Sequence, residues 1–263
     1  MLLAIDVGNT NITLGLYEAA ELKHAWRLAT VHERMPDEYG LQLLGLLEHA
    51  GSGRGDIDAI ALASVVPPLT SALSQACQDY LGQAPFVVDA GVKTGLRIRY
   101  EDPKHALGAD RVVDAVAVVT LYGGPACVVD FGTATTFDAI SSEGEYLGGA
   151  IAPGIGIAAD ALFQRTAKLP RVELAKPPNV IGSNTVNAIQ SGLLYGYVGL
   201  VEGIVNRFRA ELGSKMKVIG TGGLAPIIAE ETDVIEIQAP WLTLDGLRLV
   251  WALNNPGPAP QDT

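Results

Sequence analysis

The chain has 263 residues, 48% of them hydrophobic, so it can bury a sizeable core and is not a disordered protein. Its 29 acidic and 18 basic side chains give a formal net charge of −11, which disfavours nucleic acids and anionic membranes as partners. The two cysteines and four histidines lack the number or spacing of a disulfide framework or a metal cluster, and we find no basic leader or membrane-length apolar run. These features predict a cytoplasmic protein that holds an anionic substrate through backbone amides, a metal ion or a few basic residues.

The first half of the chain is predicted to open with a β-hairpin. An apolar run, Met1–Asp6, is followed by a polar turn and then by Asn11–Tyr17, where polar and apolar residues alternate as in a half-buried strand. Beyond this hairpin, the apolar pattern and its glycine and proline breaks predict strands at 22–28, 57–66, 86–89 and 96–100 and helices at 36–50, 69–81 and 109–122.

The second half repeats the opening of the first. Gly123-Gly124-Pro125 ends a helix, and we place a domain boundary there, between residues 1–122 and 123–263. Directly after it, ACVVDFGTATTFDAI can be laid beside LLAIDVGNTNITLGLY from the N-terminus. We expect a third strand up to residue 150, helices at 156–166 and 184–208, and a strand at 217–219. The repeat predicts a duplicated α/β fold with a cleft between its halves.

The turn of each hairpin carries an Asp-x-Gly sequence. In Asp6–Asn11, Gly8 lets a ligand approach the backbone, successive amides can point at phosphate, and Asp6 can hold a hydrated cation. An ordinary polar turn is the alternative. The pattern returns at Asp130–Thr136, where Thr133, Thr135 and Thr136 add hydroxyls beside Asp130. This repetition favours two turns that grip a polyphosphate.

A third motif, Gly108-Ala109-Asp110-Arg111, stands at the start of an apolar helix. Asp110 can be a first-turn acid that stabilises the helix, or a base for a substrate hydroxyl beside an anion-binding Arg111. Asp114, one helical turn further on, is interpreted as a solvated or structural residue.

Two glycine-rich segments have competing interpretations. Thr221-Gly222-Gly223 either lets an adenine or ribose lie close to the backbone or forms a tight turn between a strand and a helix. Gly154–Ala159 matches G-x-G-x-x-A, but the preceding residues indicate antiparallel strands, so we expect a close-packed loop and helix start rather than a dinucleotide site. The sequence contains neither a P-loop motif nor a G-x-S-x-G motif.

Four motifs in order, DVGNTN at 6–11, GADR at 108–111, DFGTATT at 130–136 and GGAIAPG at 148–154, resemble those of type III pantothenate kinases. The resemblance extends to about Trp251. It implies the acetate and sugar kinase and actin superfold, with two ribonuclease-H-like halves. The implied reaction is transfer of the γ-phosphoryl group of ATP to pantothenate, which gives 4'-phosphopantothenate in the first step of coenzyme A biosynthesis.

The resemblance also implies roles for individual residues. Asp110 would be the catalytic base, Asp130 would bind a monovalent cation (K⁺ or NH₄⁺), and Asp6 would hold Mg²⁺ through water. The residues implied in ATP binding are Asp6, Val7, Gly8, Asn9, Thr10, Asn11, Ile12, Thr13 and Thr133. Those implied in pantothenate binding are Tyr100, Gly108, Ala109, Asp110, Arg111 and Thr185, with Thr185 at a dimer interface. The stretch from Tyr100 to Gly108 is one residue longer than usual in the family.

Other functions on the same fold remain open at this point. Another small-molecule kinase or a polyphosphate hydrolase would carry the same paired turns, and some relatives are described as non-catalytic accessory factors for transcription. We also expect a homodimer, because the helix through 189–205 has more apolar residues than one buried stripe requires, among them Leu193, Leu194, Val198, Leu200 and Val201.

Overall fold

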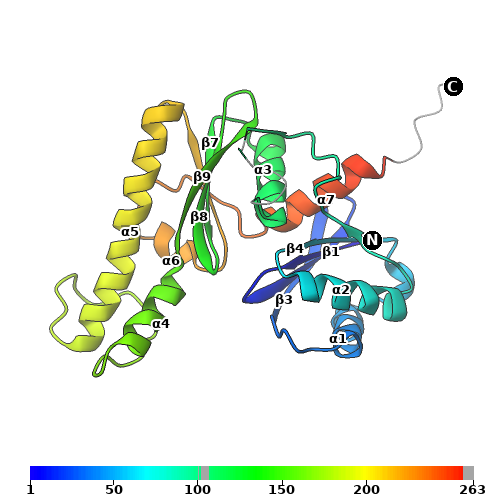
Figure 1. Ribbon diagram of the computed structural model, residues 1–263, viewed down its shortest axis with the longest axis horizontal. Helices are drawn as coiled ribbons and strands as arrows, with labels where there is room; N and C mark the ends of the chain where they lie inside the picture. Colours follow the sequence, from blue (N-terminus) through cyan, green and yellow to red (C-terminus); the bar gives the residue numbers. More distant parts are fainter. Residues whose placement is uncertain (100, 102–106, 257–263) are drawn as a thin grey trace. The chain divides into compact units, whose positions relative to one another are not determined.

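The computed structural model describes residues 1–99, 101 and 107–256 (Figure 1). They form two compact units, each with its own β-sheet. Within the described residues, the first unit contains 1–95, 107–117 and 243–256, and the second contains 96–99, 101 and 118–242.

The sheet of the first unit has the strand order β3-β2-β1-β4-β5. β1 pairs antiparallel with β2 and parallel with β4, so the predicted hairpin is confirmed and a crossover connects it to β4. The strands are β1 (Leu2–Val7), β2 (Asn11–Glu18), β3 (Glu21–Ala29), β4 (Ala59–Ser64) and β5 (Phe86–Val87). The helices are α1 (Pro36–His49), the 3₁₀ turn η1 (Arg54–Asp56), α2 (Pro67–Ala76), the π-helical turn η2 (Cys77–Leu81), α3 (Ala109–Leu121) and α7 (Leu242–Asn254). Residues 118–121 at the end of α3 and the first residue of α7 belong to the second unit.

The packing of α1 against the α2–η2 segment depends on a glycine. A Cβ atom added at Gly40 would overlap the ring of Tyr80 and lie 2.7 Å from its Cε2 atom. The Tyr80 hydroxyl donates to Asp37 Oδ1 at 2.7 Å, in the first turn of α1. The ring therefore occupies the space that a side chain at position 40 would need.

The second unit repeats this topology. β7 pairs antiparallel with β8 and parallel with β10, as β1 does with β2 and β4, and the sheet order is β11-β10-β7-β8-β9-β6. The strands are β6 (Arg97–Ile98), β7 (Ala126–Phe131), β8 (Ala134–Ile140), β9 (Glu145–Pro153), β10 (Lys217–Thr221) and β11 (Ile237–Gln238). The helices are α4 (Ile155–Arg165), α5 (Thr185–Leu212) and α6 (Ala225–Ala229). The predicted duplication is thus visible in the register of both sheets.

Helix α5 is the main core helix of the second unit. Of the described helices it alone has the length and composition to cross a membrane, yet it packs its apolar residues into the core of this unit. Leu193, Leu194, Val198 and Val201 are buried inside the single chain, and Leu200 is partly buried. The apolar residues from which we predicted a dimer are therefore already covered by other parts of the same chain.

The two units do not follow the predicted boundary between residues 122 and 123. α7, expected in the second half, belongs to the first unit, because the Tyr17 hydroxyl donates to Asp245 Oδ1 at 2.9 Å and Leu244 packs against Gly15. β6, expected in the first half, joins the edge of the second sheet beside β9. Both differences come from pairings between residues far apart in the sequence.

Candidate functional site

The first Asp-x-Gly turn joins β1 to β2 and is closed by residues that follow β3. The Gly8 amide donates to the Asn11 carbonyl at 3.0 Å, and the Thr30 hydroxyl donates to the Gly8 carbonyl at 2.7 Å. The Thr30 amide donates to the Thr10 carbonyl at 2.9 Å. Three hydrogen bonds therefore fix the shape of this turn.

The eight residues of the first turn that are predicted to bind ATP, at positions 6–13, differ in the groups that they can offer to a ligand. Val7 and Ile12 are fully buried, so they can contribute only backbone groups. Asn9, Thr10 and Asn11 are exposed at the tip of the turn. The partly buried residues Asp6, Gly8 and Thr13 form the base of the turn.

Asp6 lies at the end of β1, directly opposite Thr13 on β2 and beside Ala63 on β4. Residues that pair directly across strands present their side chains on the same face of the sheet. A carboxylate and a hydroxyl are thus available on one face. These oxygen donors fit a hydrated Mg²⁺ ion, which typically keeps several waters and few protein ligands.

The Gly108–Arg111 motif lies at the same end of the strands as the first turn. A Cβ atom at Gly108 would overlap the Asp110 carboxylate and lie 3.3 Å from Val65 Cγ1. Val65 directly follows β4, and its amide donates to the Val7 carbonyl at the end of β1 at 3.1 Å. The first unit therefore brings the first turn and Asp110 together at the carboxyl ends of β1 and β4.

The Asp110 side chain bonds to the backbone at the start of α3 and remains partly exposed to solvent. Its Oδ1 accepts the Arg111 amide at 2.8 Å, as expected of an acid in the first turn of α3. Asp110 and Ala109 are partly exposed, whereas Arg111 is 8% exposed. Asp114 is only 3% exposed, so its interpretation as a solvated residue was wrong and the structural interpretation remains.

The second Asp-x-Gly turn, in the second unit, is in close contact with glycines from two other segments. A Cβ atom at Gly222, whose φ is +88°, would overlap Asp130 Oδ1 and lie 2.7 Å from the Phe131 amide nitrogen. A Cβ atom at Gly154 would overlap the Thr133 carbonyl, to which the Gly154 amide donates at 3.1 Å. The expected close-packed loop before α4 is therefore confirmed.

The cation ligands predicted around Asp130 are only partly brought together. Asp130 lies directly opposite Thr136 and beside Thr221, so these residues share a face of the sheet. Thr135 pairs with Phe131, points to the opposite face and is 1% exposed, so the expectation that it lies beside Asp130 was wrong. Thr133 is exposed at the tip of the turn, where a phosphate group can reach it.

The oxygen donors around Asp130 can be compared with what different kinds of cation require. Among the described residues, no group of three or more histidine, cysteine, aspartate or glutamate side chains could hold a metal ion. Asp130 supplies a single charge, and Thr136 and Thr221 on the same face of the sheet supply neutral hydroxyl oxygens. This donor set fits a monovalent cation.

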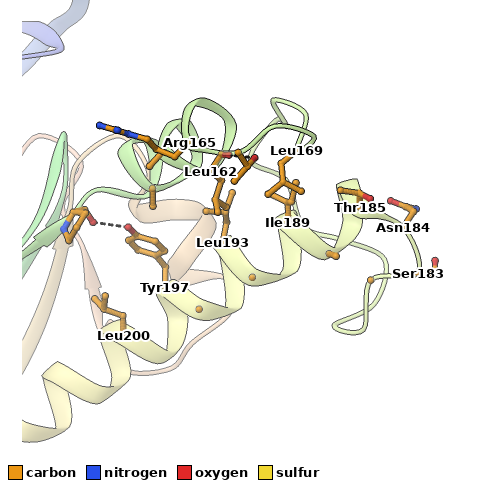
Figure 2. A pocket seen from close by; sticks show the side chains of 18 residues that line it. Leu162, Arg165, Leu169, Ser183, Asn184, Thr185, Ile189, Leu193, Tyr197 and Leu200 are labelled. Carbon is orange, nitrogen blue, oxygen red and sulfur yellow. Dashed lines mark hydrogen bonds between the residues drawn. The ribbon is translucent and has the colours of Figure 1, made fainter.

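Thr185 is far in sequence from the other predicted residues and lines an open groove of about 1130 Å³ in the second unit (Figure 2). It is the first residue of α5, and the Oδ1 atom of its neighbour Asn184 caps the helix by accepting the Asn187 amide at 2.9 Å. Figure 2 shows the groove between α4 and α5, with Tyr197 donating to the Pro153 carbonyl at 2.7 Å. Its apolar wall includes Leu162, Leu169, Ile189, Leu193 and Leu200.

Three residues differ from the sequence prediction in how the structure treats them: Tyr100, Thr30 and Val65. Tyr100 lies outside the described residues. Thr30 and Val65 were missed, since each acts through a backbone contact with a segment distant in the sequence. No local motif marks either residue.

Comparisons with known proteins agree with this arrangement. Residues 2–207 match the family described as Type III pantothenate kinase. A type III pantothenate kinase from Moorella thermoacetica is 58% identical over 97% of this chain and 100% of the relative. One from Geobacillus kaustophilus is 52% identical over 97% of this chain and 98% of the relative.

Solved structures share the fold at low sequence identity. A Campylobacter jejuni protein, described as a Baf family transcriptional activator, has a TM-score of 0.59 and 22% identity, with 97% of this chain and 98% of that one covered. Ethanolamine utilization protein EutJ from Carboxydothermus hydrogenoformans has a TM-score of 0.55 and 14% identity, with 94% and 89% covered. The predicted actin-like α/β fold class, with two sheets in two halves, is confirmed. From the family match and the high identity over full-length relatives, we conclude that this chain belongs to the type III pantothenate kinase family.

Proposed function

We propose that this protein transfers the γ-phosphoryl group of ATP to the primary hydroxyl of pantothenate, giving 4'-phosphopantothenate in the first step of coenzyme A biosynthesis. The observation that carries the proposal is the 58% identity with a type III pantothenate kinase over its whole length. Support comes from the first unit, where the first Asp-x-Gly turn and Asp110 lie together at the carboxyl ends of β1 and β4, and from the second unit, which repeats the Asp-x-Gly turn.

Phosphoryl transfer passes through a loose transition state, so the protein contributes mainly positioning and charge stabilisation. In the first unit, the turn closed by Thr30 presents Asn9, Thr10 and Asn11 to the phosphates of ATP. Asp110 accepts the proton of the substrate hydroxyl as it attacks. Gly108 and Ala109 leave room for the substrate beside this carboxylate, and Arg111 contributes positive charge close to it.

The proposed function also involves two cations, one bound by each unit. Mg²⁺, held through water by Asp6, would neutralise charge on the phosphates when bound. K⁺ or NH₄⁺ would be held by Asp130 with the Thr136 hydroxyl, near the exposed Thr133.

We also propose a cytoplasmic homodimer. Support comes from the rim of the groove, where Val180 and Ile181 are 62% and 87% exposed. Their loop is fixed, because the Ser191 hydroxyl donates to the Val180 carbonyl and Gly182 packs against the backbone of α5 at Ala188. A rigid apolar projection beside an apolar groove allows two copies to pack against each other symmetrically, and Thr185 would lie at that interface.

The dimer has its own test in solution. Ile181→Lys should convert the dimer to a monomer in light scattering at micromolar concentration, and Lys215→Gln, a change at an exposed position outside the groove, should leave it dimeric. A wild-type monomer with full activity would refute this assembly.

One assay tests the proposed reaction against its alternatives. ATP turnover is coupled to a spectroscopic readout and measured with and without pantothenate. The proposal expects turnover only when pantothenate is present. Turnover with another alcohol or with polyphosphate alone would identify a different kinase or a hydrolase, and no turnover with any substrate would favour an accessory protein.

A further inference from the structure

A buried carboxylate lies beside the proposed cation site of the second unit. Asp138 is on β8, two residues after Thr136, so both side chains are on the face of the sheet that also carries Asp130. Asp130 and Thr136 are partly exposed, whereas Asp138 is 1% exposed. A ligand from solvent can therefore reach Asp130 and Thr136 but not Asp138.

Two hydroxyl groups of the same unit bond to the Asp138 carboxylate. The Tyr146 hydroxyl, from the fully buried tyrosine on β9, donates to Oδ1 at 2.7 Å. The Thr136 hydroxyl donates to Oδ2 at 3.4 Å. The second bond is long for two oxygen atoms, so it gives the hydroxyl proton a direction more than it adds stability. Both oxygens of the buried carboxylate thus accept a hydrogen bond.

The direction of the Thr136 hydroxyl proton decides what the oxygen of this side chain can bind. A threonine hydroxyl has one proton and two lone pairs, and an ionised carboxylate can only accept hydrogen bonds. Because the Thr136 proton points to Asp138, the lone pairs of the Thr136 oxygen remain for a cation beside Asp130, which lies directly opposite on β7. If the proton pointed to the cation instead, the hydroxyl would repel it.

We propose that Asp138 is a positioning residue for the cation site: by accepting the Thr136 hydroxyl, it makes the oxygen of that hydroxyl a ligand for K⁺ or NH₄⁺. The inference rests on the proposed function, in which this cation binds at Asp130. Asp130, Thr136, Asp138 and Tyr146 lie on β7, β8 and β9, so all the residues involved belong to the second unit.

Asp138→Asn is the direct test, because asparagine keeps the size of the side chain but can offer an amide donor to Thr136. The hydrogen bond can then reverse and turn the hydroxyl proton towards the cation. Binding is measured without turnover, as the rise in Tm when KCl replaces tetramethylammonium chloride at constant ionic strength with MgATP present. The K⁺ concentration that gives half of this rise should increase about tenfold, as is common when a group that orients a metal ligand is altered.

Two tyrosine variants support this test. Tyr146→Phe removes one donor from Asp138 and should shift the K⁺ response in the same direction by a smaller factor, so it decides the matter if Asp138→Asn does not fold. Tyr17→Phe is the matched control in the first unit. It also removes a bond from a buried tyrosine to a carboxylate, at 2.9 Å to Asp245 Oδ1, and should leave the K⁺ response unchanged.

A double-variant cycle separates positioning from a direct effect of the Asp138 charge. Thr136→Val removes the hydroxyl and keeps the shape of the side chain. In that background, Asp138→Asn should have no further effect on the K⁺ response, because Asp138 acts through this hydroxyl. Additive shifts, an unchanged response in the single Asp138 variant, or a wild type that K⁺ does not stabilise would each overturn the proposal. A wild type that K⁺ stabilises but that lacks pantothenate-dependent turnover would refute the proposed function instead, and the cycle would still decide on Asp138.

Discussion

Replacing Asp110 by Asn separates the two roles that this residue can have. Asn keeps the size of the side chain, and its Oδ1 can still accept the Arg111 amide that Asp110 accepts at 2.8 Å. What is lost is the negative charge, and with it the ability to take a proton from the substrate hydroxyl. The start of α3 should therefore survive while the base is removed.

The two roles predict effects of very different size. General-base assistance contributes about 10²–10⁴-fold to a rate, so kcat should fall by at least about a hundredfold, or roughly 2.7 kcal/mol in activation free energy. The lost interaction with the helix dipole is worth only about 0.3–1 kcal/mol of stability, which corresponds to a Tm shift of about 1–4 °C. ATP affinity should hardly change, since the carboxylate acts on the other substrate.

The assay combines steady-state kinetics with calorimetric ATP binding and thermal unfolding. Asp114→Asn is the control on the same helix. Because Asp114 is 3% exposed, this change should lower the free energy of unfolding by about 1–3 kcal/mol but alter kcat only mildly. Near-normal turnover of the Asp110 variant would contradict the role as base and indicate a helix cap. Loss of ATP binding would indicate instead that Asp110 is a metal ligand.

Three further predictions concern the cation, the packing of α1 and a buried thiol. Asp130→Ala should abolish most activity together with its dependence on K⁺ or NH₄⁺, and equal wild-type rates in sodium and potassium buffers would contradict the cation site. Gly40→Ala should lower the free energy of unfolding by about 1–3 kcal/mol in a urea titration, because its methyl group overlaps the Tyr80 ring; Gly45→Ala, on the same helix with open space around it, should be neutral or stabilising. Burial raises the pKa of Cys77 to about 12, so the folded protein should resist iodoacetamide at pH 8. Because the folded pKa is the higher one, this thiol's contribution to stability is complete below the unfolded value of about 8.5 and falls as pH rises from there towards 12, which urea titrations between pH 8 and 10 should detect.

The sequence was most informative where a pattern is local. Alternation of polar and apolar residues along Asn11–Glu18, and its repeat after Ala126, predicted both hairpins. Successive side chains of a strand point to opposite faces of the sheet, so this pattern is visible in residues that are adjacent in the sequence. The same alternation, counted residue by residue, would have placed Thr135 on the face opposite Thr136.

Pairings between distant segments could not be read from the sequence. α7 reaches the first unit through Tyr17 and Asp245, which are 228 residues apart, and nothing near either residue marks this hydrogen bond. The burial of Asp114 is likewise invisible, since a carboxylate on a helix is usually solvated. For the candidate site, residue types were predictable, whereas the supporting contacts from Thr30 and Val65 were not.

Because α7 packs in the first unit, the two units are completed in a fixed order during translation. Residues 118–242 of the second unit are continuous, so only β6 must be recruited from upstream when this part leaves the ribosome. The first unit, in contrast, begins at Met1 but lacks the partner of Tyr17 until Asp245 has been made. Although its N-terminal strands are translated first, this unit is the last to be completed, and its sheet must wait with the α7 face uncovered through most of translation.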